Sequence, residues 1–315
     1  VVGYSRGSVL NCYNSGAVNG NDRFVGGVIG AGHSKAVENC YNSGRVNSSS
    51  YAVGGIVGCD YGAEIKNCYN TGTVSGSSTA GGVVGSSYGI VEKCYNRGAV
   101  IGGTFIGGLI GHSSSTIVKN CYNAGTVDSS DVFVGGLIGL TGYKGMVVNC
   151  YNVGTVGGES SVGGLTGDND LNDHAIIENC YYLADCGTDL NANGTALSAA
   201  QFTSKDSFAG WNFNNIWEIG YDADYAYPTL KYFGSREFLC RVLFMDGETI
   251  LSDTLCHESE TVSVSAPSHS EYDFAYFEDE NGKKYSSGDT IVVGSDDIIC
   301  RAVWTVRNTS EAVWD

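Results

Sequence analysis

The chain has very little of several things that other protein classes need. Its 315 residues include two prolines, and no run of 18 apolar residues occurs, so a membrane-spanning helix is not expected. Basic residues are also scarce, because 17 Lys and Arg stand against 34 Asp and Glu. Nucleic acids and anionic membranes are bound through basic patches, so neither is an expected partner. The scarcity of proline leaves nearly every backbone N–H available to a β ladder.

What the chain has instead is repetition. A phrase centred on Cys-Tyr occurs seven times, and successive cysteines are 26 to 30 residues apart. A period this steady indicates one structural unit per repeat, each burying its apolar face against its neighbours. The seven cysteines are Cys12, Cys40, Cys68, Cys94, Cys121, Cys150 and Cys180.

A second phrase, Gly-Gly-x-x-Gly, precedes each of the last six cysteines by about half a repeat. Its copies begin at Gly26, Gly54, Gly81, Gly107, Gly135 and Gly163. The alternation of this phrase with Asn-Cys-Tyr-Asn-x-Gly over residues 1–186 resembles the GLUG repeats of bacterial cell-surface proteins. The resemblance implies an extracellular location, on the cell surface or secreted. GLUG repeats also occur in proteins that resemble IgA-cleaving metallopeptidases.

Short Val- and Ile-rich segments, cut by Gly, Asn and Ser, predict strands and turns. In one repeat, strands are expected at residues 104–110, 116–122 and 125–128. The prediction is an all-β fold: a right-handed parallel β-solenoid of about seven coils of ~27 residues, with rungs ~4.8 Å apart. Apolar residues three before and six after each Cys should form core ladders, as Val91 and Val100 do around Cys94. The Asn two after each Cys should mark a corner that tolerates positive φ.

The repeated cysteines are interpreted as buried thiols. Stacking places their Cβ vectors parallel, which is poor disulfide geometry, and along a line, which is a poor metal site. Five cysteines lie outside the column: Cys59, Cys186, Cys240, Cys256 and Cys300. Cys180 with Cys186, and Cys240 with Cys300, are candidate disulfide pairs, and the pairing of these six cysteines is left open.

The tyrosine after each Cys gives the candidate binding site. If Cys faces inward, an outward aromatic stripe follows, which could stack on sugars or on a partner protein. It consists of Tyr13, Tyr41, Tyr69, Tyr95, Tyr122 and Tyr151, continued by Tyr181. The alternative is that the rings stiffen the rod or are covered by a crossing segment. In that case binding would move to the variable loops 48–50, 75–78 and 128–131.

The rest of the chain breaks the period. Residues 187–235 predict a capping segment with a short helix and an aromatic cluster, needed because an open solenoid end exposes core and strand edges. Residues 236–304 resemble the Listeria–Bacteroides repeat, a small β-grasp-like module, although Phe277 replaces its usual Trp. Residues 305–315 are expected to be a tail or linker.

The charge is unevenly divided along the chain. Residues 1–186 carry a net charge of −4 and residues 187–315 a net charge of −13. Because the chain starts inside a repeat, it is expected to be part of a longer multidomain protein.

No catalytic constellation is found. His33 and His112 are interpreted as turn residues. The only acidic loops offer weak calcium candidates, at Asp168, Asp170, Asn172, Asp189, Asn191 and Asn193, and Ala200 stands where a bidentate Glu would be needed. The sequence therefore predicts a protein without cofactor or enzyme activity, for adhesion or ligand presentation to a host protein or glycan. The alternatives are an accessory region of a larger secreted peptidase and a carbohydrate-active β-helix enzyme.

Overall fold

The computed structural model describes residues 2–307 except 22, 50, 143, 170–174, 188–192, 221–224, 234–238, 248, 258–260 and 294–297. The chain divides into two compact units, Val1–Tyr232 and Phe233–Asp315. Among the described residues, no helix is long and apolar enough to cross a membrane.

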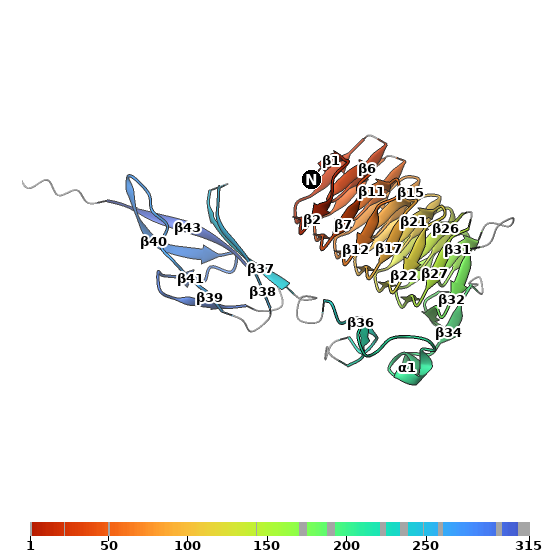
Figure 1. Cartoon of the computed structure of the whole chain (residues 1–315). Helices are drawn as coiled ribbons and strands as arrows, with labels where there is room; N and C mark the ends of the chain where they lie inside the picture. The colour runs from red at the N-terminus through yellow and green to blue at the C-terminus, as the bar shows by residue number, and fades with distance from the viewer. Residues whose placement is uncertain are drawn as a thin grey trace, which may run out of the picture. The chain divides into compact units, whose positions relative to one another are not determined.

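The first unit is a parallel β-solenoid, as predicted (Figure 1). Each coil has five short strands where three were expected. In one coil these are β20 (Phe105–Gly107), β21 (Ile110–Ser113), β22 (Ile117–Lys119), β23 (Tyr122–Asn123) and β24 (Val127–Ser129). The first predicted strand is divided at its Gly-Gly pair, and the second is divided at the Asn-Cys pair. In both places the chain turns a corner of the coil.

Equivalent strands of successive coils pair in parallel and build five sheets. Sheet A contains β1 (Val2–Ser5), β6 (Ile29–Gly32), β11 (Val57–Asp60), β16 (Val84–Ser87), β21, β26 (Ile138–Thr141) and β31 (Thr166–Asn169). Sheet B contains β2 (Val9–Leu10), β7 (Ala36–Glu38), β12 (Glu64–Lys66), β17 (Ile90–Glu92), β22, β27 (Met146–Val148) and β32 (Ile176–Glu178). Sheet C contains β3 (Tyr13–Asn14), β8 (Tyr41–Asn42), β13 (Tyr69–Asn70), β18 (Tyr95–Asn96), β23, β28 (Tyr151–Asn152), β33 (Tyr181–Leu183) and β34 (Thr195–Leu197).

The remaining two sheets complete the coil. Sheet D contains β4 (Val18–Gly20), β9 (Val46–Ser48), β14 (Val74–Gly76), β19 (Val100–Gly102), β24 and β29 (Val156–Gly157). Sheet E contains β5 (Phe24–Gly26), β10 (Ala52–Gly54), β15 (Thr79–Gly81), β20, β25 (Val132–Gly135) and β30 (Ser160–Gly163). The pairing keeps the sequence repeats in register, so that Tyr69 lies opposite Tyr95 and Val74 opposite Val100.

The predicted apolar and cysteine ladders form the core. Val91, Cys94 and Val100 are fully buried, and their counterparts in the neighbouring coils are buried as well. The thiols also link the coils, because the backbone N–H of Cys68 donates to Sγ of Cys94 at 3.4 Å. Each buried Sγ in turn donates to a carbonyl, as Cys94 does to Glu92 at 3.2 Å. Cys12, in the first coil, is exposed.

The predicted corner with positive φ lies three residues earlier than expected. The left-handed residue is the one before each Cys, with φ between 51° and 57°. The positions are Asn11, Asn39, Asn67, Lys93, Asn120, Asn149 and Asn179. Asn is the non-glycine residue that best tolerates this conformation, which explains its recurrence at six of the seven positions.

The Asn two after each Cys is instead part of a buried amide ladder. Asn70 Nδ2 donates to Oδ1 of Asn96, and Asn96 Nδ2 to Oδ1 of Asn123, both at 2.8 Å. Each amide also donates to a carbonyl two residues on, as Asn96 does to Gly98. A Cβ at Gly82 would lie 2.3 Å from the Asn96 side chain. The two fixed phrases of the repeat therefore meet in the core, because the amide needs a glycine opposite it.

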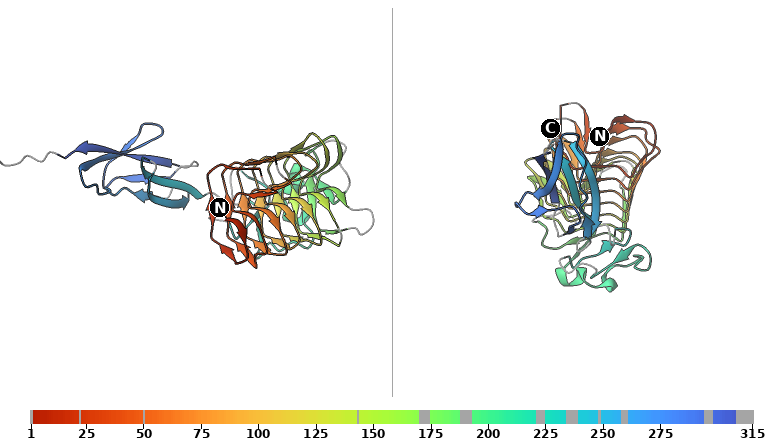
Figure 2. Two further views of the ribbon diagram at one scale, coloured as in Figure 1. Left: turned by 90° about the horizontal axis from the view of Figure 1, so that it is seen from above. Right: turned by 90° about the vertical axis from the view of Figure 1, so that its left-hand side faces the viewer.

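After the last repeat the chain covers one side of the solenoid. Strand β34 extends sheet C beyond the final coil, and the described residues 198–220 and 225–232 then lie along the outer face of the same sheet. We call residues 198–220 and 225–232 the strap. It contains α1 (Ala199–Phe202), the 3-10 helix η1 (Lys205–Ser207), β35 (Trp217–Glu218) and β36 (Thr229–Leu230). Figure 2 shows it beside the coils rather than across their end, where a cap was expected. The tyrosine face offers the strap a large apolar surface to cover.

The second unit has a five-stranded sheet in the order β38-β37-β43-β40-β41 and a two-stranded sheet, β39-β42. The bounds are β37 (Leu239–Asp246), β38 (Thr249–His257), β39 (Thr261–Ser263), β40 (Tyr272–Asp279), β41 (Lys284–Tyr285), β42 (Thr290–Val292) and β43 (Ile298–Val306). Phe244, Phe277 and Cys300 belong to its core. The turn after β40 is held by the Asp279 carboxylate, which accepts the N–H groups of Asn281 and Lys283.

Candidate functional site

The predicted tyrosine stripe exists as a stacked column on the outside of sheet C. Ring centroids of successive tyrosines from Tyr13 to Tyr151 are 4.9–5.1 Å apart, and the planes lie within 6° of parallel. Each ring therefore covers the faces of its neighbours, and only ring edges point away from the rod. A sugar needs a ring face for stacking, so this geometry favours a structural role.

The strap covers most of this column. Trp217 lies 5.9 Å from the ring of Tyr151 and 6.3 Å from that of Tyr122. Arg97 stands over the rings of Tyr95 and Tyr225. Tyr95, Tyr122 and Tyr151 are consequently fully buried, whereas Tyr13, Tyr41 and Tyr69 are half-buried. A crossing segment was the alternative to a binding stripe, and the structure has it.

Further contacts show how far the strap extends. The Tyr181 hydroxyl accepts the N–H of Ala209 at 2.9 Å, and Trp211 Nε1 donates to the carbonyl of Asn179. At the other end of the strap, Tyr232 donates its hydroxyl to Asn39 Oδ1 at 2.6 Å. Between these points the Tyr151 hydroxyl lies 2.9 Å from that of Tyr225. The strap thus runs from the last coil back to the second.

The variable loops that were the second candidate are also tied to the scaffold. The hydroxyl of Ser48 donates to the carbonyl of Gly20, and that of Ser77 donates to Ser49, both at 2.7 Å. Ser129 bonds in the same way to Gly103. These three hydroxyls connect neighbouring coils.

The calcium candidates do not converge among the described residues. Asp168 is half-buried near the end of β31, and Asn193 donates its amide to Thr166 Oγ1 at 2.8 Å. Asp170, Asn172, Asp189 and Asn191 lie outside the described residues. In the part of the chain that the structure describes, no three His, Cys, Asp or Glu residues form a group that could hold a metal ion.

The candidate disulfides are also absent. Cys180, Cys186 and Cys300 are free, buried thiols. Cys180 Sγ donates to the carbonyls of Glu178 and Val147 instead. In the second unit, Cys300 pairs in register with Phe244, whereas Cys240 lies opposite Cys256. Neither predicted pair, Cys180 with Cys186 or Cys240 with Cys300, therefore forms.

An exposed group of rings, which sequence reasoning missed, lies on the first four coils, mostly where strands of sheet E begin and strands of sheet A end. We call it the aromatic corner, and it consists of Tyr4, Phe24, His33, Tyr51, Tyr61 and Tyr88. The four tyrosines are 38–56% exposed, in contrast to the buried part of the column. His33 stacks on Tyr61 with centroids 4.8 Å apart, and Tyr61 stacks on Tyr88 at 6.1 Å.

Other rings of the aromatic corner meet at steep angles. Phe24 stands at 81° to Tyr51 and at 87° to Tyr61, with centroids 6.4 and 6.2 Å away. A hollow of about 270 Å³ is lined by Arg23, Phe24 and Tyr51. A second arginine, Arg6, stands 5.8 Å from the centre of the Tyr4 ring. The corner therefore combines rings at right angles with two arginines.

A buried carboxylate supports this surface from below. Asp60 is 1% exposed, and its Oδ1 accepts the N–H groups of Gly62 and Ala63 at 3.0 and 2.6 Å. Ser87 Oγ donates to Oδ2 at 3.2 Å. Burial raises the pKa of Asp60 despite these hydrogen bonds, which favour the ionised form. Asp60 thus fixes the turn that carries Tyr61 and is not itself presented to a ligand.

A sequence signal for the aromatic corner did exist. The position just after each sheet A strand is not fixed by the repeat: later repeats have Ser114 and Gly142 there, whereas earlier ones have His33, Tyr61 and Tyr88. His33 was interpreted as a turn residue, but its ring is part of the exposed group. His112, interpreted in the same way, lies in β21, where burial lowers its pKa. The signal lies in departures from the repeat, which a search for repeated residues ignores.

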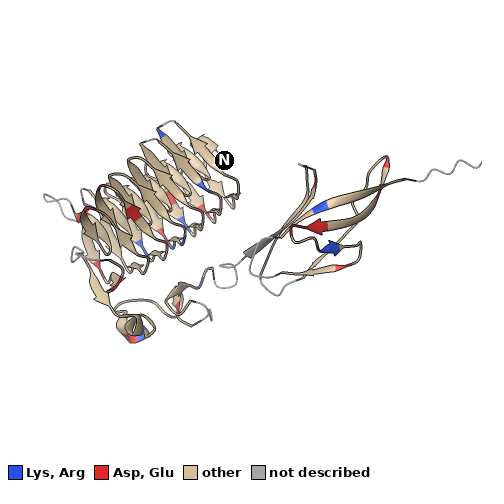
Figure 3. Cartoon of the chain, turned by 180° about the vertical axis from the view of Figure 1, so that it is seen from behind, with Lys and Arg blue, Asp and Glu red and all other residues tan. Residues whose placement is uncertain are grey.

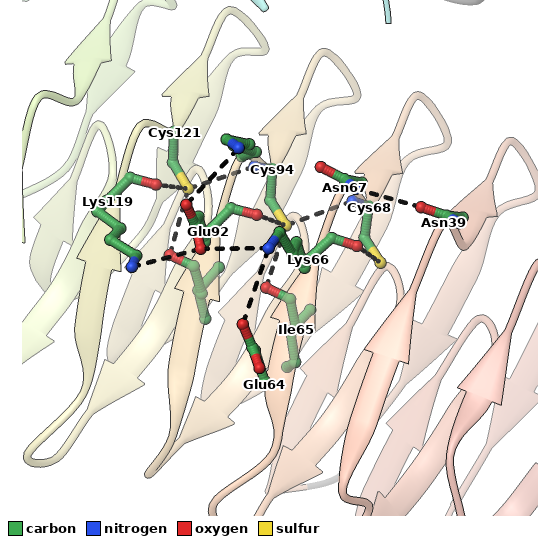
Figure 4. Close-up of polar contacts among 12 residues, drawn as sticks. Asn39, Glu64, Ile65, Lys66, Asn67, Cys68, Glu92, Cys94, Lys119 and Cys121 are labelled. Atoms are coloured by element: carbon green, nitrogen blue, oxygen red, sulfur yellow. Dashed lines mark hydrogen bonds and ion pairs between the residues drawn. The ribbon is translucent and has the colours of Figure 1, made fainter. Parts of the chain in front are cut away.

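Charged residues are sparse and mixed on the solenoid (Figure 3). On sheet B, Glu92 lies 3.3 Å from Lys119 and 3.8 Å from Lys66 and Lys93 (Figure 4). Lys66 also reaches Glu64 at 4.0 Å. These pairs link three coils through side chains that are 12–45% exposed.

Comparison with known proteins supports the fold. Residues 49–75, about one repeat, match the GLUG motif. A solved structure from Bacteroides ovatus, of a protein described as a candidate immunoglobulin A1 protease, is similar with a TM-score of 0.52 and 21% sequence identity. The similarity covers 69% of this chain and 75% of that one. At this identity it shows the fold alone. No curated protein matches this chain significantly.

Proposed function

We propose that the chain is a non-catalytic, ligand-binding β-solenoid of a bacterial surface or secreted protein, with a role in adhesion or ligand presentation. The observation that carries this proposal is the aromatic corner, where four tyrosines stay 38–56% exposed while the repeated tyrosines are covered. Exposed aromatic clusters on a folded protein mark interaction sites. The function needs no metal or cofactor, because ring faces and guanidinium groups supply the contacts.

The extracellular location is supported by the GLUG match and by the acidic composition. The whole chain has a formal net charge of −17, most of it after residue 186, and such a charge suits solubility outside the cell. We also propose that the second unit is a Listeria–Bacteroides repeat-like module. Its support is the burial of Phe277, at 2% exposure, where that family usually has Trp, and the Asn-Gly turn after β40.

A second candidate function is an accessory region of a larger secreted peptidase. The description of the Bacteroides ovatus neighbour favours it. In that role the solenoid would bind the substrate, or the extracellular material around it, for a catalytic domain elsewhere in the protein. The aromatic corner would then still be a binding site. A carbohydrate-active β-helix enzyme would instead need paired carboxylates facing solvent, and among the described residues Asp60, beneath these rings, is buried.

The test combines binding and turnover on one sample. The whole chain is applied to an array of glycans and host extracellular proteins, together with a Tyr51→Ala/Tyr61→Ala variant and a matched control, Tyr272→Ala. Tyr272 is 40% exposed, so its removal is a comparable surface change in the other unit. We expect the double variant to lose binding while the control retains it, and we expect no hydrolysis of immunoglobulin A1 or of polysaccharides. Measurable turnover would contradict the non-catalytic proposal.

A further inference from the structure

We infer that the aromatic corner binds a chain of acidic sugars. This inference rests on the proposed ligand-binding function and names the ligand class. It depends on three features of the corner: the ring orientations, the direction in which the rings extend, and the sign of the charges beside them.

The ring orientations suit a pyranose. A sugar ring has an apolar face of C–H groups and a polar rim, so it fits a surface that offers an aromatic face beside hydrogen-bond donors. Phe24 and Tyr51 meet at 81° and enclose, with Arg23, the hollow of about 270 Å³. That volume lies just below the usual range of about 300–1,000 Å³ for small-molecule pockets. It therefore suits one sugar unit of a longer chain.

The rings extend along the rod. His33, Tyr61 and Tyr88 come from three successive coils and stack in order. The surface is thus elongated parallel to the rod axis, next to the hollow. An elongated surface with one hollow fits a polymer that places one unit in the hollow and runs its neighbours past Tyr61 and Tyr88.

The charges favour an anionic polymer. In a chain of net charge −17, two arginines lie among the described residues of this surface: Arg23 lines the hollow, and the guanidinium carbon of Arg6 is 5.8 Å from the centre of the Tyr4 ring. Guanidinium groups bind carboxylates through paired, charge-assisted hydrogen bonds. The Asp60 carboxylate beneath the rings is not presented to a ligand, and the N–H groups of Gly62 and Ala63 partly offset its charge.

Two other ligand classes fit less well. An added peptide strand needs a free sheet edge, but β10 and β11 at the corner are each paired on both sides. Anionic membranes bind clusters of about four to eight basic residues, and the corner presents two arginines.

The experiment measures binding of the whole chain to polygalacturonate and, as the neutral counterpart, to unsubstituted galactan, at low and high salt. The variants are Arg23→Gln and Tyr51→Ala, with Arg45→Gln and Tyr272→Ala as exposed controls in the same sample set. We expect binding to polygalacturonate that weakens with salt and that Arg23→Gln and Tyr51→Ala each reduce by about tenfold or more. The controls should stay within about twofold of the wild type, and melting curves should show that all variants are folded.

The outcomes separate this inference from the proposed function. Equal binding of galactan and polygalacturonate, lost with Tyr51→Ala, would overturn the acidic preference and keep the binding function. Binding that none of the corner variants affects would overturn the site. Capture of a host protein on the array through the same residues would overturn the glycan class only. Failure to bind any glycan or protein on the array would overturn both.

Discussion

Two groups of aromatic rings, the tyrosine column and the aromatic corner, run along the same solenoid, and they differ in repetition, ring orientation and exposure. The tyrosine column repeats in every coil, stacks with planes within 6° of parallel and is covered by the strap from Tyr95 onward. The aromatic corner uses positions that differ between coils, its rings meet at up to 87°, and it stays exposed. The difference teaches that in this repeat protein the repeated residues build the scaffold, whereas the departures from the repeat provide a surface that a ligand can recognise.

The most severe test of this comparison removes a ring that covers the column. Trp217 is fully buried, and it lies 4.3 Å from Trp211 as well as against Tyr122 and Tyr151. Trp217→Ala should lower the free energy of unfolding by about 3–5 kcal/mol, because it leaves a large cavity. Urea unfolding measures this. The exposed Tyr88→Ala should change stability by less than about 0.5 kcal/mol. Equal losses of stability in the two variants would contradict the conclusion that the tyrosine column is structural and the aromatic corner is not.

The next effect concerns the buried amide ladder beneath the column. Asn96→Leu removes the partner of the Asn70 amide and of the Asn123 carbonyl oxygen. Leaving these groups buried without partners should cost about 2–4 kcal/mol. Asn14→Leu, at the half-exposed first rung, should cost about 1 kcal/mol, because water can replace the lost bonds. Thermal melting of both variants compares the two losses of stability. A larger loss for Asn14→Leu than for Asn96→Leu would contradict a stabilising role of the buried amide ladder.

Alkaline pH should weaken the scaffold through its thiols. Burial raises the pKa of Cys59 and of Cys186 to about 11, from an ordinary value of 9.0. The unfolded chain loses these protons near pH 9, so the stabilisation is present below pH 9 and is lost as pH rises towards 11. We expect a loss of about 1–3 kcal/mol over that range. Melting curves at pH 8 and pH 10.5 measure it, and a Cys59→Ala/Cys186→Ala variant should show a smaller drop.

The smallest effect is expected on sheet B, which belongs to neither group of rings. Glu92→Gln removes the centre of the ion pairs with Lys66, Lys93 and Lys119. Half-exposed pairs of this kind contribute about 0–1 kcal/mol, and salt screens them. The change in melting temperature should therefore disappear at high salt. A loss of several kcal/mol would show that the coils depend on these charges as well as on the aromatic column.

The repeated part of the structure could be predicted from sequence because each signal occurs six or seven times. The period gave the solenoid, and the ladders of Val91, Cys94 and Val100 followed from their fixed distances. The role of Asn96 could not be found in this way, because an Asn followed by Gly also fits a turn. In the folded chain its amide points into the core against Gly82.

The strap and the aromatic corner were beyond the same reasoning for two further reasons. Trp211 and Trp217 stand in a non-repeating segment, and nothing in their order says whether they cover the end or the flank of the rod. Tyr51 occurs once, and Tyr61 has only Tyr88 as a counterpart, so they carry almost no periodic signal, and their contact through Phe24 depends on how two sheets meet.

The hydrogen bond between Tyr232 and Asn39 joins residues 193 positions apart and changes how the solenoid responds to pulling. In a repeat protein whose coils touch only their neighbours, a force on the last coil peels coils away one by one. Here the chain leaves the first unit at Tyr232, beside the second coil, after running along the rod. A pull from the C-terminal side is therefore resisted first by the Tyr232 contact and then by the aromatic packing of the strap, before it reaches the final coil. The strap would act as a mechanical buffer for the coils that carry the binding surface.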